Sequence, residues 1–339
     1  MTLTYYRYLF CAFIIFSIAP LGYYLYNKQL AENTDTQSSI LTEYNFVDVD
    51  HPIQPLPQQI TIDKNWLALG KALFNSPLLS KDNSISCSSC HLVDFGGDDG
   101  FAVSTGVGGA QGSRNSPTVL NAVFNIRQFW DGRSSSLADQ VSGPIHNPVE
   151  MASTWPEITN KLQNDSYFTT SFEQLSASGI TQDNIIKAIT IYEQSLITPN
   201  APIDKFLLGD ENALTAQQKR GYKKFVSYGC ITCHQGRNIG GNILQKLGRI
   251  NAIPETLKHD RGKFELTKKD IDLYVFKVPS LRNIALTAPY FHNGSVNNLE
   301  QAVQIMAKVQ LGIELSTQDT NDIVALLESF SAPALELTP

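Results

Sequence analysis

The sequence leaves no pair of cysteines for a structural disulfide, and it contains no run of basic residues. Four of its five cysteines stand in two short motifs of the same pattern, and the fifth, Cys11, lies in an apolar N-terminal segment. With a net charge of −6 and no cluster of Lys and Arg, nucleic-acid binding has no support. Strand-like patterns are few, which favours a mainly α fold. Methionine (three) and histidine (six) are also scarce, so each can be considered individually.

The two cysteine motifs both read Cys-x-x-Cys-His, at 87–91 and 230–234. Two thiols at this spacing can both add to the vinyl groups of one haem, and the next residue is placed to reach its iron. Redox dithiols and zinc half-sites do not require the adjacent histidine. The motifs therefore predict two covalently bound haem c groups: haem one on Cys87, Cys90 and His91, and haem two on Cys230, Cys233 and His234.

An apolar segment runs from Tyr8 to Tyr26, between Arg7 and Lys28. Its length suits one membrane-spanning helix, and no convincing cleavage site precedes Ala31. Residues 1–30 are therefore predicted to be an uncleaved anchor in the inner membrane. A cleaved signal peptide, which would release a soluble periplasmic protein, is the alternative. Haem c is attached outside the bacterial inner membrane, so both interpretations predict the periplasm.

The remaining chain has signals for a tether and two domains. Residues 31–60 are polar and then rich in proline, which predicts an extended tether. The stretch 198–202 breaks the clearest helical pattern and is the best domain boundary. We predict two mainly α, cytochrome c-like haem domains with long loops, over residues 61–200 and 201–330. The C-terminal tail is a candidate for packing back on the first domain.

Several helices can be placed from their first residues. Asp63 is a candidate N-cap, Thr154 precedes a helix start with proline in its first turn, and Thr215 begins a capping box. Apolar residues at helical spacing predict helices over 181–196, 299–308 and 317–330, and a helix is also expected over 118–129. A short strand is expected over 274–278, and 94–116 reads as a long loop.

The second axial ligands must come from the few remaining His and Met residues. Met306 lies on a predicted helix after the second motif, and a methionine opposite a histidine raises a haem's reduction potential. An ordinary core methionine is the competing interpretation. His259 stands among charged residues and reads as a solvated loop residue. For haem one no second strong ligand is apparent, and beside such an open iron Glu150 would be a candidate general acid–base.

Long stretches outside the haem motifs resemble the bacterial dihaem cytochrome c peroxidase family. The resemblance extends from about residue 67 to 330 and is far more specific than the haem motif alone. The matching stretches are ALGKALF (68–74), RNSPTVLNAVFN (114–125), QFWDGR (128–133), GPI (143–145), VEM (149–151), YVF (274–276) and LRNIALTAPYFH (281–292).

The resemblance implies roles for the matched residues around the two haems. Haem one would be the low-potential peroxidatic site, and haem two, with Met306, the high-potential site that receives electrons. Glu150 would be the distal acid–base, with Gln140 its neighbour in the peroxide pocket. Trp130 would lie between the haems on the electron path. The implied enzyme is a cytochrome c peroxidase that reduces hydrogen peroxide to water.

The same resemblance implies further ligands and partners. A calcium ion between the domains would be held by Asn115 and by the backbone carbonyls of Thr287 and Pro289. The electron donor would be a small cytochrome c or copper protein, bound through a small, transient interface. The family is often dimeric, so a homodimer is an expectation for this chain.

The glycine-rich loop at 104–114 departs from the family pattern. Family members usually carry a histidine there that ligates haem one in the oxidised enzyme, and the best-matched residue in this chain is Val107. Valine cannot ligate iron, so we expect haem one to stay open without reductive activation. His146, four residues before Glu150, is a candidate replacement as a ligand or pocket residue.

Two other functions remain as alternatives. A dihaem cytochrome that only transfers electrons would not need Glu150. A dihaem oxidase of a protein substrate, like the methylamine-utilisation enzyme that matures a tryptophan-derived cofactor, also lacks the loop histidine. That enzyme has a tyrosine where this chain has Met306, so Met306 favours the peroxidase.

Overall fold

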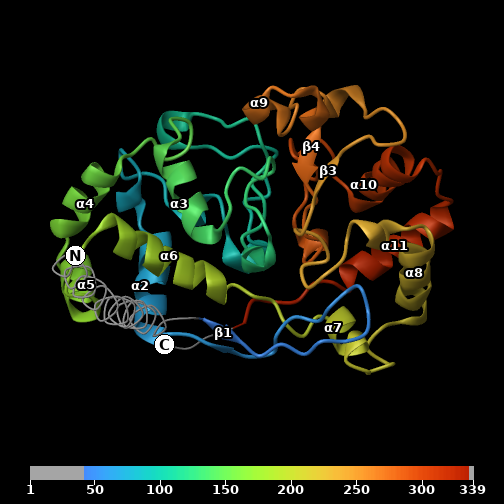
Figure 1. The fold of residues 1–339 in the computed structure, drawn as a ribbon, viewed down its shortest axis with the longest axis horizontal. Helices are drawn as coiled ribbons and strands as arrows, with labels where there is room; N and C mark the ends of the chain where they lie inside the picture. The colour runs from blue at the N-terminus through green and yellow to red at the C-terminus, as the bar shows by residue number, and fades with distance from the viewer. Residues whose placement is uncertain (1–41, 336–339) are drawn as a thin grey trace, which may run out of the picture. The chain divides into compact units, whose positions relative to one another are not determined.

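Helices are the main regular structure of residues 42–335, the part of the chain that the computed structural model describes, and long loops connect them (Figure 1). The mainly α fold predicted from the sequence is thus confirmed. Strands are short: β1 (Glu43–Tyr44), β2 (Ile60–Thr61), β3 (Leu244–Lys246) and β4 (Val275–Lys277). The helices are α2 (Lys64–Phe74), α3 (Leu137–His146), α4 (Trp155–Gln163), α5 (Ser166–Leu175), α6 (Gln182–Ser195), α7 (Pro202–Leu207), α8 (Ala216–Ser227), α9 (Phe264–Thr267), α10 (Leu299–Met306) and α11 (Thr317–Glu328).

Helix α2 packs across α6 at a glycine. Asp63 caps α2 as predicted, because its carboxylate accepts the amide hydrogens of Asn65 and Trp66 at 2.9 and 3.1 Å. A Cβ atom at Gly70 would lie 2.0 Å from the carbonyl oxygen of Ala188 in α6. Only glycine allows this approach, so the crossing point of the two helices is set by one residue.

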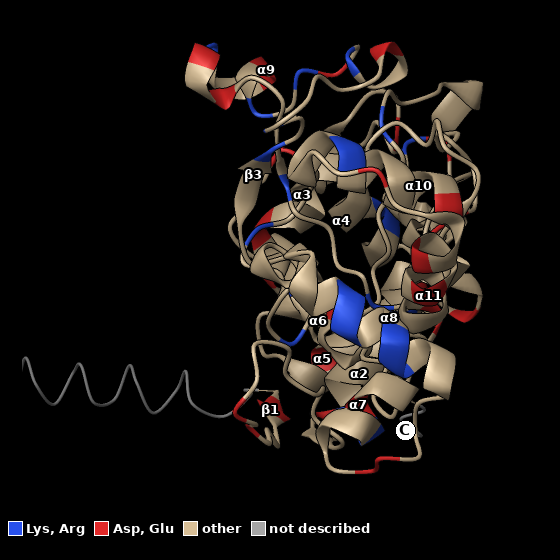
Figure 2. Ribbon diagram, turned by 90° about the vertical axis from the view of Figure 1, so that its right-hand side faces the viewer, with Lys and Arg blue, Asp and Glu red and all other residues tan. Residues whose placement is uncertain are grey.

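A second helix pair, α8 and α11, crosses in the same way. A Cβ atom at Gly221 would lie 1.9 Å from the carbonyl oxygen of Asp322. Figure 2 shows basic positions on α8 and acidic ones on α11, and Lys224 Nζ lies 2.7 Å from the buried carboxylate of Asp322. Both α2 and α8 carry Gly-x-x-x-Phe, at 70–74 and 221–225. The two haem-motif segments therefore share a structural repeat that is faint in the sequence.

The proline-rich segment, expected to be a tether, packs on the rest of the protein from residue 44 onward. Ile53 and Leu56 are 0% and 2% exposed. The amide of Leu56 donates to Asp204 Oδ1 at 3.2 Å, and Arg282 donates to the carbonyl of Gln54 at 3.1 Å. Composition predicts an extended chain here, but only the fold supplies the buried groups that bind it.

The helix expected over 118–129 is wrong. In this stretch only a 3₁₀ turn, Ala122–Phe124, is formed. Asn121 and Phe129 have φ values of 61° and 66°, a left-handed conformation that a continuous α-helix excludes. Asn121 is fully buried, and its side chain binds Thr198 through two hydrogen bonds of 2.8 and 2.9 Å. These contacts fix an irregular segment that leads into the functional site.

The other expected elements lie close to their predicted positions. The patterns at 181–196, 299–308 and 317–330 correspond to α6, α10 and α11, and the strand near 275 is β4, which pairs antiparallel with β3. Leu335 donates its amide hydrogen to the carbonyl of Ile197 at 2.7 Å. The domain boundaries at 61, 200 and 330 remain predictions.

The predicted anchor, residues 1–30, lies outside the described residues. Within residues 42–335, no helix is both long enough and apolar enough to cross a membrane.

Candidate functional site

Each Cys-x-x-Cys-His motif begins with a 3₁₀ turn, Cys87–Ser89 in the first and Cys230–Thr232 in the second, and the second cysteine caps that turn. The amide of His91 donates to the carbonyl of Cys87 at 3.0 Å, and the amide of His234 donates to that of Cys230, also at 3.0 Å. The turn brings two thiols and one imidazole together within five residues, as attachment of a single haem requires.

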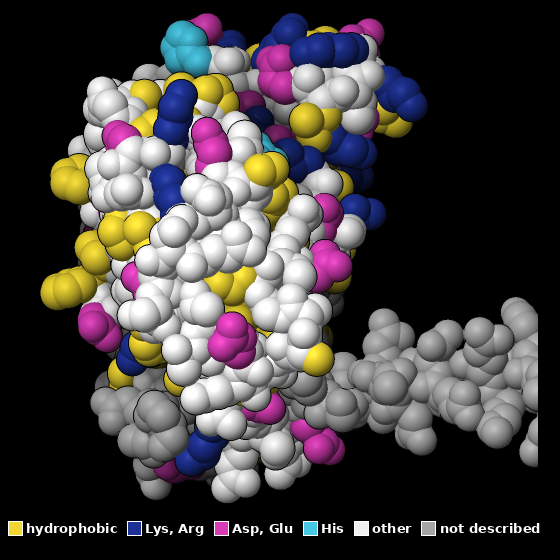
Figure 3. Space-filling model, turned by 90° about the vertical axis from the view of Figure 1, so that its left-hand side faces the viewer, with side chains coloured by type: hydrophobic (Ala, Val, Ile, Leu, Met, Phe, Trp, Pro, Cys, Tyr) yellow, Lys and Arg dark blue, Asp and Glu magenta, His cyan; other side chains and the backbone are white. Residues whose placement is uncertain are grey.

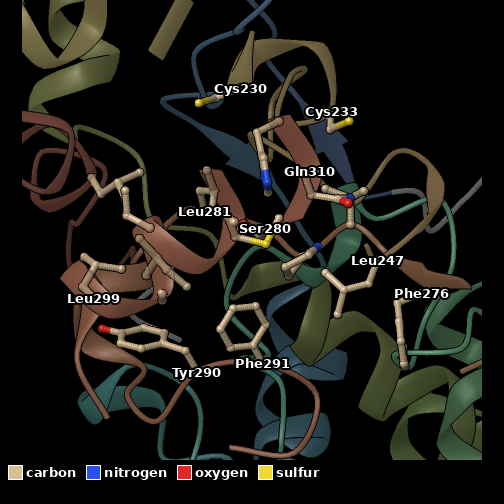
Figure 4. Close-up of a pocket in the computed structure, with 18 of the residues that line it drawn as sticks. Cys230, Cys233, Leu247, Phe276, Ser280, Leu281, Tyr290, Phe291, Leu299 and Gln310 are labelled. Carbon is tan, nitrogen blue, oxygen red and sulfur yellow. The ribbon is translucent and has the colours of Figure 1, made fainter. Parts of the chain in front are cut away.

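Cavity two, of about 240 Å³, surrounds the second motif and is lined mainly by apolar groups. Cys230, Cys233, His234 and Met306 all line it, so the structure brings the predicted axial pair of haem two together. Figure 4 shows the two thiols at one side, with Tyr290 and Phe291 across the cavity. Met306 ends α10 and is followed by a wider π-type turn, Ala307–Leu311, a feature frequently found at functional sites.

Cavity one, of about 640 Å³, surrounds the first motif. The sequence-predicted residues of the peroxidatic site line it together with the motif, although they come from different segments of the chain. They are Cys87, Cys90, His91, Trp130, Gln140 and Glu150.

The two motif histidines are prepared to bind iron. His91 Nδ1 lies 3.2 Å from the carbonyl oxygen of Gly97, and His234 Nδ1 lies 3.4 Å from that of Ile239. A carbonyl only accepts, so Nδ1 carries the hydrogen and Nε2 keeps its lone pair for a metal. Burial lowers the pKa of both rings, that of His234 to about 4, which keeps them neutral. The residues present therefore fit two haem c groups.

Glu150 has a perturbed carboxyl group. Burial in cavity one raises its pKa, and this effect outweighs the opposing hydrogen bond from Asn147 Nδ2 (2.6 Å) and the positive charge of Arg133. A buried carboxyl group with a raised pKa is a candidate to accept a proton and return it in a reaction at this site.

Glu193 is a site residue that the sequence analysis missed. It projects from α6 into cavity one, and Gln140 Nε2 donates to its two carboxyl oxygens at 2.9 and 3.0 Å. Burial raises the pKa of Glu193 to about 8. A signal existed in the sequence, because Glu193 continues the spacing of Ile185 and Ile189 on the apolar face of that helix.

Replacing Glu193 by glutamine should make stability less dependent on pH. The folded protein holds a proton on Glu193 up to about pH 8, whereas the unfolded chain releases it near its ordinary value of 4.5. Wild-type stability from this group is therefore present below about pH 4.5 and lost as pH rises toward 8. The advantage of the variant over wild type should grow by up to about 1.4 kcal/mol per pH unit in this window. Urea unfolding at a series of pH values measures it, and a constant difference would contradict the assignment.

Trp130 lines both cavities. Its indole Nε1 donates to the carbonyl of Asn115 at 2.9 Å, and its ring meets the edge of His292 at a centroid distance of 6.3 Å. Its side chain is thus held in the wall between the two haem sites.

Asn115, Thr287 and Pro289, the predicted calcium ligands, all line cavity two. Asn115 is buried, and its Nδ2 donates to the carbonyl of Phe101 at 2.9 Å, which orients the side-chain oxygen away from that bond. Within the described part of the chain, no group of three or more His, Cys, Asp and Glu residues could hold a metal ion. A calcium ion here would depend on neutral oxygens, which are acceptable ligands for it.

The glycine-rich loop at 104–114, which departs from the family pattern, is hydrogen-bonded to the backbone of Glu150. The amide of Val107 donates to the carbonyl of Glu150 at 2.9 Å. His146 lies outside the set of cavity-one lining residues: it is exposed, its Nδ1 bonds the carbonyl of Ser153 at 3.0 Å, and its ring packs on Trp155. His259, expected to be a solvated loop residue, is exposed but also lines cavity one.

Known proteins resemble this chain over most of its length. Residues 64–212 match the family described as di-haem cytochrome c peroxidase. Cytochrome c peroxidase Ccp of Escherichia coli is 48% identical over 285 residues, which cover 83% of this chain and 61% of that protein. Cytochrome c551 peroxidase of Pseudomonas aeruginosa is 43% identical, over 82% of this chain and 84% of that protein.

A solved structure also shares the fold. It is the crystal structure of a MauG-like protein associated with microbial copper homeostasis, with a TM-score of 0.72 and 26% sequence identity. The match covers 86% of this chain and 96% of that one. Together with the sequence relatives, these matches confirm the predicted family: the chain belongs to the dihaem cytochrome c peroxidases.

Proposed function

We propose that this chain reduces hydrogen peroxide to water at haem one, with electrons that reach it through haem two. The observation that carries the proposal is the position of Glu150, a buried carboxyl group with a raised pKa that lines the same cavity as His91. The peroxidase names of the two sequence relatives support the same reaction.

The residues of cavity one divide the proton chemistry between them. Haem one, when bound, supplies the iron at which the oxygen–oxygen bond of peroxide is reduced. Glu150 takes a proton from one peroxide oxygen and returns it to the other, so that water can leave. Gln140 is held by Glu193 through its amide nitrogen, which leaves its side-chain oxygen as the acceptor for peroxide. Each turnover consumes two electrons and two protons and yields two waters.

Haem two has the ligands of an electron-accepting site. His234 and Met306 line one cavity and would hold the iron of haem two, and a His and Met ligand pair would give that haem a high reduction potential. Trp130, in the wall between the cavities, provides the path from haem two to haem one. The donor is a small cytochrome c or copper protein. On the side of the molecule that lies at the left of Figure 1, acidic and basic side chains are scattered among uncharged ones (Figure 3).

The proposal also includes a bound calcium ion, a periplasmic location and a homodimeric assembly. A calcium ion held by Asn115, Thr287 and Pro289 would order the loops around the wall between the cavities. Residues 1–30 would tether the enzyme to the inner membrane on its periplasmic side, or be cleaved as a signal peptide. Two copies would form a homodimer.

A dihaem oxidase of a protein substrate is the second candidate. The resemblance to the MauG-like structure favours it, since the match covers nearly all of that protein. Met306 in cavity two opposes it, because the methylamine-utilisation enzyme carries tyrosine at that position.

Peroxide turnover with a reduced small cytochrome should begin at equal rates in the fully oxidised and half-reduced protein. The reason is that Val107 stands where the family has its loop histidine, and a valine side chain has no atom that can ligate iron. The amide of Val107 is hydrogen-bonded to the carbonyl of Glu150. Stopped-flow oxidation of the donor cytochrome measures both rates. Electron paramagnetic resonance of the oxidised protein should show a high-spin haem.

Two results would contradict this. A lag that pre-reduction abolishes would show that another residue closes haem one; His259→Ala, with His146→Ala as the matched control, would then test the histidine that lines the cavity. No turnover in either state would reject the peroxidase.

A further inference from the structure

The charges of cavity two are unbalanced. Lys277 is the one Lys or Arg among its described lining residues, and that set contains no Asp or Glu. Lys277 is 6% exposed, and its pKa falls to about 8 with burial as the sole cause. A buried ammonium group without a counter-charge is strongly unfavourable, so its partner is to be sought outside the polypeptide.

Cavity one provides the contrast. Its two arginines are already compensated by carboxylates, because Arg114 Nε lies 2.6 Å from Asp260 and Arg133 Nη1 lies 3.0 Å from Asp131. Lys277 has no such ion pair within residues 42–335. The polypeptide therefore neutralises its own cations around haem one and leaves one uncompensated around haem two.

The backbone of Lys277 is fixed in place. It ends β4, pairs with Leu244 of β3, and donates its amide hydrogen to the carbonyl of Trp130 at 2.7 Å. Trp130 lines both cavities, so the lysine stands beside the wall that separates the two haems. These bonds anchor the main chain that carries the lysine.

We propose that Lys277 forms an ion pair with a propionate carboxylate of haem two. A propionate is the anionic group that a haem brings into a protein, and the chain offers no competing carboxylate in this cavity. Lys277 is a positioning residue, since it acts on the iron through the haem. Its positive charge neutralises the negative charge of the propionate. Because that negative charge stabilises the ferric iron, the ion pair favours the ferrous form and raises the reduction potential of haem two.

The test measures the reduction potentials of both haems in the haem-loaded protein by spectroelectrochemistry. In Lys277→Met, the one-electron reduction of haem two should become about tenfold less favourable, a fall of about 59 mV. The potential of haem one should change much less. Lys277→Arg should keep most of the wild-type value. Lys246→Met, which removes an exposed charge from the neighbouring strand, is the matched control and should change neither potential.

Several outcomes would overturn the proposal. The first is an unchanged potential of haem two in Lys277→Met. The second is a fall in the potential of haem one as large as that of haem two in the same variant. The third is a fall in the potential of haem two in Lys277→Arg as large as in Lys277→Met. Should the methionine variant fail to fold, redox-difference infrared spectra of wild type and Lys277→Arg give a second test. The propionate bands should shift between these two proteins, and identical bands would contradict the pair. These measurements do not depend on peroxide turnover, so the ion pair and the proposed function can fail separately.

Discussion

Replacing Glu150 by glutamine should lower peroxide turnover by about 10²- to 10⁴-fold, the usual contribution of a general acid–base. Glutamine has nearly the same size and can still accept the 2.6 Å hydrogen bond from Asn147, but it cannot take up a proton and return it. The absorption spectra and potentials of both haems should stay unchanged, because Glu150 is not an iron ligand in the proposed site. Steady-state oxidation of a reduced small cytochrome by peroxide measures the loss.

The control for this variant is Glu173→Gln, which changes an exposed carboxylate on α5 and should leave turnover unaffected. Full turnover in Glu150→Gln would show that Glu150 is not the acid–base and would contradict the proposed peroxidase mechanism. Retention of donor oxidation without peroxide consumption would favour the purely electron-transferring cytochrome.

Replacing Asp204 by alanine should lower the free energy of unfolding by about 3–5 kcal/mol, the cost of leaving one member of a buried ion pair without its partner. Both side chains of the Asp204–Arg282 pair are fully buried, with nitrogen–oxygen distances of 2.8 and 3.0 Å. Asp204 also accepts the amide hydrogen of Leu56, so the substitution releases the proline-rich segment as well. Urea unfolding of the haem-loaded protein, followed by circular dichroism and haem absorbance, measures the change.

An exposed ion pair serves as the comparison. Lys219 and Glu211 lie 3.5 Å apart, and the Glu211 side chain is 77% exposed. Glu211→Ala should therefore cost less than about 1 kcal/mol. A cost for Asp204→Ala as small as that of the exposed pair would show that Arg282 finds another partner.

Features encoded within a few neighbouring residues could be predicted from the sequence. The two haem motifs are complete within five residues each, and the cap at Asp63 depends on the amides of the next turn. Glu150 was a candidate acid–base from the residues alone, and the family resemblance added Gln140 and Trp130. The structure brings all three to cavity one. The helix expected over 118–129 failed because its apolar pattern carries no sign of the distant partner of Asn121.

The sequence by itself therefore determined the two haem motifs, the mainly helical class and the candidate acid–base. Only the tertiary structure decided which buried polar and charged groups meet. Gln140 and Glu193 are 53 residues apart in the chain, and Asp204 and Arg282 are 78 apart. The sequence also could not show that Lys277 has no carboxylate near it, because the residues that line cavity two come from distant parts of the chain. The physical reason is that the energy of a buried charge depends on every group that the fold brings near it, not on its neighbours in sequence.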